Sequence, residues 1–169
     1  MFDKFGEFDS AEEINRAAAA QKAEGDTEAV MAIAAENGID KEEVEDYLDG
    51  VVEELTTPLL AALGKLEEES RELKLAGVLL DWTDELKTMC TESPEFAFAV
   101  RKKGKELAGY IALTADSGYE HRAVVDRRIV DKTTAVKGII GSHEFSIGIP
   151  DKKTRRGLAE KYYLGKETA

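Results

Sequence analysis

The spacing of apolar residues predicts helices over the first 50 residues. Apolar side chains recur at helical intervals, for example at Ile14, Ala18, Val30, Ile33 and Val44. Helix caps and helix-ending glycines divide this pattern into three segments: Ser10 to Gly25, Asp26 to Gly38, and Asp40 to Gly50. We therefore predict a small N-terminal module of three packed helices, residues 1–50.

The pattern stays helical to about residue 116 and then changes. Pro58 and Pro94 mark helix starts, because proline is favoured at the first helical position. Between residues 117 and 150, β-branched runs and scattered glycines predict up to two short strands or a β-hairpin. Asp151 then caps a last helix, "KKTRRGLAEKYYLG". The expected fold is mainly α: the 1–50 module, then a helical body, 51–169, whose basic C-terminal part is α+β.

The composition is that of a folded domain without membrane segments. Hydrophobic residues fill 43% of the 169 positions, which excludes a disordered chain. No apolar run approaches the roughly 20 residues of a membrane helix, and "MFDKFGEFDS" lacks the apolar stretch of a secretory signal. The single cysteine, Cys90, fits a reducing compartment. We expect a cytoplasmic protein that binds no membrane.

The net charge of −12 is unevenly distributed along the chain. Residues 1–95 hold 8 basic and 26 acidic residues, a net charge of −18, whereas residues 96–169 hold 15 and 9, a net charge of +6. One half could therefore meet a basic partner and the other an acidic one. The alternative interpretation is a solvated acidic helical surface.

The acidic stretch "AENGIDKEEVEDYLDG" has three possible interpretations. A calcium loop starting at Asp40 fails, because Val44 stands at a ligand position and Glu45 at the glycine position. A helix–turn–helix DNA reader is disfavoured, because phosphates would repel the second helix. We therefore interpret it as a protein-binding acidic surface formed by Glu42, Glu43, Glu45, Asp46 and Asp49.

Three basic clusters lie in the C-terminal half. Arginine binds phosphates through two hydrogen bonds, and tyrosines such as Tyr162 and Tyr163 can stack on bases. Any single cluster could equally be a solvated helix face, with these tyrosines in the core. Together they favour a surface for nucleic acid or for an acidic partner, and we predict weak, non-specific DNA binding by Arg101, Lys102, Lys103, Lys105, Arg127, Arg128, Lys152, Lys153, Arg155 and Arg156.

Catalytic and metal chemistry receive little support from the sequence. His121 or His143 could act as a base, with Cys90 or Ser142 as nucleophile, but no local motif joins them. One cysteine and two histidines without close spacing do not form a zinc-ligand set. We expect no enzymatic activity, no metal and no cofactor. The apolar residues Leu73, Leu79, Leu80, Trp82, Phe96 and Phe98 are interpreted as core.

Two stretches carry a family resemblance. Residues 5–50, "FGEFDSAEEINRAAAAQKAEGDTEAVMAIAAENGIDKEEVEDYLDG", resemble an N-terminal module in small proteins of clostridial phages and mobile elements. "PEFAFAVRKKGKELAGYIALTA" and "GIPDKKTRRGLAEKYYLG" resemble PcfK-like proteins, in which a terminal helix ends in paired aromatic residues. The chain departs from that pattern at Gly109, where cysteine is common, and in its longer insert from 117 to 147.

Both sets of sequences are similar to anti-CRISPR inhibitors of the type II RNA-guided nuclease. The resemblance implies a non-enzymatic inhibitor in a bacterial host cell, whose partner is the type II CRISPR effector with its guide RNA. An acidic helical face could occupy the positively charged channel of that nuclease as a mimic of DNA phosphates. The competing hypothesis is an accessory binding protein of a mobile element that has no nuclease target.

Overall fold

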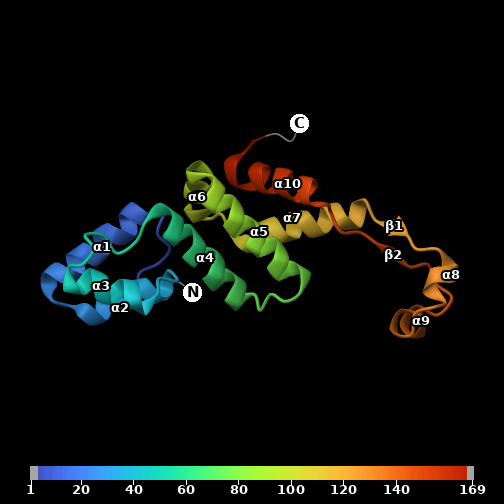
Figure 1. Ribbon diagram of the computed structural model, residues 1–169, viewed down its shortest axis with the longest axis horizontal. Coiled ribbons are helices and arrows are strands. Elements are labelled where there is room, and N and C mark those ends of the chain that lie inside the picture. Colours follow the sequence, from blue (N-terminus) through green and yellow to red (C-terminus); the bar gives the residue numbers. More distant parts are fainter. Residues whose placement is uncertain (1–3, 167–169) are drawn as a thin grey trace.

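The computed structural model describes residues 4–166, which fold into a row of helices ending in a projecting arm (Figure 1). The helices are α1 (Ala11–Glu24), α2 (Thr27–Glu36), α3 (Lys41–Asp49), α4 (Pro58–Glu72), α5 (Val78–Glu92), α6 (Pro94–Arg101), α7 (Leu107–Glu120), α8 (Arg127–Val130), α9 (Ala135–Ile140) and α10 (Lys152–Leu164). The strands are β1 (Ala123–Val124) and β2 (Ser146–Ile147).

Local sequence signals set most helix boundaries. The Ser10 hydroxyl accepts the Glu13 amide at 3.2 Å, and Asp26, Thr57, Ser93 and Asp151 cap their helices in the same way. At the other ends, α1, α3 and α10 stop at glycines with φ of 77°, 77° and 69°. This left-handed conformation is costly for other residues and ends a helix cleanly.

The N-terminal helices enclose a small core of their own. Ile14 of α1, Val30 and Ile33 of α2, and Val44 and Tyr47 of α3 are all buried. The same core includes Leu55 and Ala61, which lie beyond residue 50. The α4 helix therefore closes the N-terminal core with one face, while the domain boundary near residue 50 stays a prediction.

The helical body has a second core. Leu66 of α4, Leu86 of α5, Phe96 of α6 and Tyr110 of α7 are fully or almost fully buried there, together with Tyr163 of α10. The terminal helix rests on α7 at Gly109, where an added Cβ would lie 2.2 Å from the Tyr162 hydroxyl. Cysteine, common at this position in the PcfK-like pattern, would therefore collide with Tyr162.

A buried polar seam joins the two cores. The Lys65 ammonium, 1% exposed, donates to the Lys102 carbonyl at 2.8 Å and lies 3.1 Å from a Glu7 carboxylate oxygen. The Glu69 carboxylate accepts the Leu107 amide at 2.9 Å. Burial raises the pKa of Glu69 to about 7, although the Lys65 ammonium opposes that rise. Charged and polar groups thus hold the N-terminal segment, α4 and the α6–α7 loop together.

The arm, residues 121–149, extends from the ends of α7 and α10 (Figure 1). Its strands pair antiparallel, with Ala123 opposite Ile147 and Val124 opposite Ser146. At its base the backbones of Gly118 and Gly148 approach so closely that a Cβ on Gly118 would lie 2.5 Å from the Gly148 carbonyl oxygen. Only glycines permit this contact.

The predicted mainly helical fold with a short antiparallel pair near the C-terminus is confirmed. Within residues 4–166, both strands lie between 117 and 150, as expected. The sequence did not predict α8 and α9, because helices of four and six residues are too short for periodicity to reveal. The interpretation of Leu73, Leu80 and Phe98 as core is wrong, since all three side chains are exposed.

Candidate interaction surfaces

The first surface is an acidic ridge on α3 and the turn after it. We define it as the exposed residues Glu42, Glu45, Asp46, Asp49, Glu53 and Glu54. Glu42, Asp46 and Asp49 are spaced four and three residues apart, so they share one helix face. Within residues 4–166, none of these three forms an ion pair, whereas Glu45 lies 3.3 Å from Lys41.

Glu43 belongs to the predicted acidic set but has a different role. Its carboxylate accepts the backbone amide of Asp40 at 3.2 Å, which completes the capping box at the start of α3. It is only partly exposed. Of the five predicted protein-binding residues, the structure thus brings four together as solvent-facing carboxylates and uses the fifth to stabilise the helix.

Two valines beside the ridge were missed in the sequence. Val51 and Val52 are 70% and 40% exposed, in the turn that follows Gly50. Exposed β-branched residues among carboxylates make this surface both anionic and apolar. The sequence did contain a signal for their exposure. Gly50 ends the helix, so Val51 and Val52 follow it outside the amphipathic pattern that would place them in the core.

The first basic cluster does not form a surface patch. Arg101 is 1% exposed, and its guanidinium donates to the Asn37 side-chain oxygen at 2.7 Å. Lys105 is partly buried. Its ammonium donates to the Tyr162 carbonyl at 2.8 Å and lies 5.2 Å from the centre of the Tyr162 ring. Lys102 and Lys103 alone of the four are exposed. Arg101 therefore cannot contact nucleic acid in this fold.

The second cluster, on α8 in the arm, is paired with acids of the same segment. Arg128 lies 3.0 Å from an Asp126 carboxylate oxygen, and the hydrogen bonds between them lower the pKa of Asp126. Arg127 lies 3.0 Å from Asp131 and donates to the Gly141 carbonyl at 2.6 Å. These contacts fold the end of the arm and compete with any phosphate.

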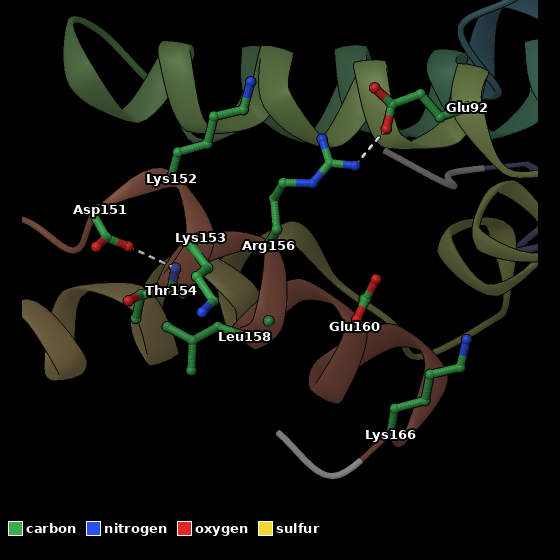
Figure 2. Close-up of a pocket in the computed structure, with 10 residues that line it drawn as sticks. Glu92, Asp151, Lys152, Lys153, Thr154, Arg156, Leu158, Glu160 and Lys166 are labelled. Atoms are coloured by element: carbon green, nitrogen blue, oxygen red, sulfur yellow. Dashed lines mark hydrogen bonds and ion pairs between the residues drawn. The ribbon is translucent and has the colours of Figure 1, made fainter. Parts of the chain in front are cut away.

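The third cluster lines an open hollow of about 1210 Å³ at the start of α10, shown in Figure 2. Lys152 and Lys153 are exposed there, whereas Arg156 pairs with Glu92. Arg155 lies beside the hollow and donates to Glu85 at 2.8 Å. Asp151 and Glu160 also line it, so its cations and anions nearly balance. The hollow is not a strong anion site.

The three basic clusters do not converge. Lys105 donates to the Tyr162 carbonyl near the end of α10, whereas Lys152 is the first residue of that helix. Tyr162 and Lys152 are ten residues apart, which is about 15 Å along the helix axis. Figure 1 places α8 at the far end of the arm. Tyr163 is buried against Phe96, and the partly buried Tyr162 ring contacts the Lys105 ammonium and the Tyr163 ring, so Tyr163 offers no face to a base and Tyr162 is already engaged.

The residues considered for catalysis lie apart. Cys90 is buried in the core of the body, and this burial raises the pKa of its thiol to about 12. His121 and His143 are exposed in the arm, and a ring nitrogen of His121 contacts the Ser117 carbonyl at 2.9 Å. Within residues 4–166, no group of histidine, cysteine and acidic side chains is placed to hold a metal ion. No helix in that range is long and apolar enough to cross a membrane.

Comparison of the chain with family models, curated proteins and solved structures found no match. The resemblance to anti-CRISPR proteins therefore stays a hypothesis drawn from the sequence.

Proposed function

We propose that this protein is a non-enzymatic inhibitor of the type II RNA-guided DNA nuclease and that it binds the nuclease through the acidic ridge. One observation carries this proposal: Glu42, Asp46 and Asp49 share an exposed helix face and have no cation to neutralise them within residues 4–166. Such a row is costly through self-repulsion and becomes favourable against a basic partner surface. The identity of the partner comes from the resemblance.

The ridge presents a row of like charges, as a DNA strand does. Residues three or four positions apart rise about 5 Å along a helix, whereas the charges of one DNA strand are spaced about 3.4 Å along the duplex axis, so the resemblance lies in the sign and the linear order of the charges. The nuclease holds its guide–target heteroduplex in a positively charged channel. A helix carrying carboxylates at this spacing could occupy part of that channel and exclude DNA.

Direct contact with DNA is a secondary part of the proposal. Lys102 and Lys103 form one exposed pair, and Lys152 and Lys153 form another at a separate place. Two small patches on an acidic protein support only weak, salt-sensitive and sequence-independent binding.

The accessory protein of a mobile element remains the second candidate. The observation that favours it is that the ridge consists mainly of carboxylates, with the exposed Val51 and Val52 in the turn after α3, and such a surface is suited to basic partners in general. A ridge of this kind acts mainly on the rate of encounter.

Reversing the ridge should slow association with the nuclease. We expect the triple variant Glu42→Lys, Asp46→Lys and Asp49→Lys to associate about tenfold more slowly, or worse, with immobilised guide-loaded nuclease at low salt. The matched control is Asp116→Lys, Glu120→Lys and Glu160→Lys, which changes the net charge equally at exposed positions of α7 and α10. Equal association rates for the two variants would mean that the ridge is only solvated.

A further inference from the structure

The arm is a protrusion whose end is held by contacts within the arm itself and lies away from the two cores (Figure 1). At its end, Val130 is 2% exposed, and Asp131 accepts both Arg127 and Lys137, at 3.0 and 3.3 Å. The Thr133 hydroxyl accepts the Lys137 amide at 3.1 Å. These bonds fix α8 and α9 into a small knob, although Figure 1 shows the knob far from both cores. The chain thus orders a segment that stabilises neither core.

The surface of the arm is apolar and cationic. Ile129 and Ile139 on the knob are 57% and 85% exposed, and Val124 and Ile147 along the strands are 62% and 50% exposed. Residues 121–149 carry five basic and three acidic residues, a net charge of +2 on a chain whose total is −12. Several exposed large apolar side chains on one protrusion are typical of a binding surface.

The opposite end of the molecule has the complementary character. Residues 40–54 carry eight acidic residues and one lysine, a net charge of −7, around the exposed Val51 and Val52. In Figure 1 this end, with α3, and the arm lie at opposite extremes of the long axis. The knob therefore cannot reach the ridge of its own chain, and a contact between them has to be intermolecular.

We propose that the arm of one molecule docks on the acidic ridge of a second copy of this chain. Ile129 and Ile139 would bury against Val51 and Val52, while the exposed Lys132, which forms no ion pair within residues 4–166, and the net charge of +2 on the arm favour the carboxylates of the ridge. The contact is heterologous, so each copy keeps a free ridge at one end and a free arm at the other, and assembly can continue head to tail. A partner bound at the ridge would block this contact, so nuclease binding and self-association exclude each other.

Sedimentation velocity of the full-length protein tests this proposal. In about 0.1 M salt the screening length is about 10 Å, so the net charges of −12 on two copies repel each other little, while an arm and a ridge in contact still attract. Under these conditions we expect the weight-average mass to rise at least about twofold between about 10 µM and 500 µM. In about 1 M salt the screening length falls to about 3 Å, and the rise should shrink markedly. Wild-type protein that stays monomeric at about 500 µM in about 0.1 M salt would overturn the proposal.

Two complementary variants identify the surfaces. The arm variant is Ile129→Glu with Ile139→Glu, and the ridge variant is Asp46→Lys with Asp49→Lys; all four positions are exposed, so the fold is expected to persist. Each variant alone should remain monomeric. Mixed in equal amounts, they offer one intact arm and one intact ridge, and we expect dimers that do not grow further.

The control is Val78→Glu with Leu80→Glu, at exposed apolar positions of α5 away from both surfaces, and it should associate like the wild type. Association of the arm variant alone, or a mixture that fails to form dimers, would show that copies meet elsewhere and would overturn the proposal. None of these measurements involves the nuclease, so they are independent of the proposed function.

Discussion

Replacing Arg101 with methionine is expected to lower the free energy of unfolding by about 3–5 kcal/mol, the usual cost of removing one partner from a buried charged network. Its guanidinium is buried in the seam between the two cores and donates to Asn37, whose own amide donates to the Ile33 carbonyl at 2.8 Å. Carboxylates of Glu7 and Glu69 act on Arg101 through charge. Methionine fills much of the volume but leaves the Asn37 side-chain oxygen without its donor, and Lys65 then remains as the cation facing the two carboxylates.

Urea denaturation followed by the fluorescence of Trp82 measures this effect, because Trp82 is the only tryptophan and is buried in the body core. The matched control is Lys103→Met, since that side chain is exposed two positions later in the same basic run. We expect the control to change stability by less than about 0.5 kcal/mol. A similar small change for Arg101→Met would contradict a structural role for Arg101 in the seam between the two cores.

Replacing Gly64 with alanine is the second substitution with a large expected effect. Gly64 lies in α4, and an added Cβ would lie 2.3 Å from the Asn37 carbonyl oxygen and 2.8 Å from that of Gly38. Both obstacles are backbone atoms, so α4 and the turn between α2 and α3 have to move apart. Overpacking of this kind costs about 1–3 kcal/mol and outweighs the gain of up to about 1 kcal/mol from replacing glycine by alanine in a helix.

Gly138 provides the matched control for that substitution. It lies within α9, it has no positive φ, and an added Cβ would meet no atom within 4 Å. We expect Gly138→Ala to leave the melting temperature unchanged or slightly higher, and Gly64→Ala to lower it by several degrees. Equal melting temperatures for Gly64→Ala and the wild type would show that α4 and the α2–α3 turn can separate without cost.

Helix boundaries could be predicted because the signals that set them are local. Ser10, Asp26 and Asp151 bond amides within their own first turns, and Gly50 stops α3 by its own backbone conformation. These interactions span three or four residues, so the sequence contains them completely. The acidic surface was predictable for a similar reason, since α3 is amphipathic and its buried face is marked by Val44 and Tyr47.

The fate of the basic residues depends on contacts between distant segments. Arg101 lies in the run "RKKGK", which is typical of a surface, but its partner Asn37 is 64 residues away in the chain. A weak signal existed, because position 101 follows the buried Ala97 by one helical turn. Arg155 and Arg156 meet Glu85 and Glu92, which α5 supplies from 70 and 64 residues away. Tertiary pairing of this kind leaves no periodic trace in the sequence.

The most direct test of the proposed function is target cleavage by a diverse panel of guide-loaded type II nucleases in the presence of the purified protein. We expect at least one nuclease to lose cleavage as the protein approaches equimolar amounts, and we expect the triple variant Glu42→Lys, Asp46→Lys and Asp49→Lys to inhibit it more weakly. The control substitutions on α7 and α10 should leave inhibition at the wild-type level. Undiminished cleavage by every nuclease in the panel would contradict the proposal and favour an accessory binding protein.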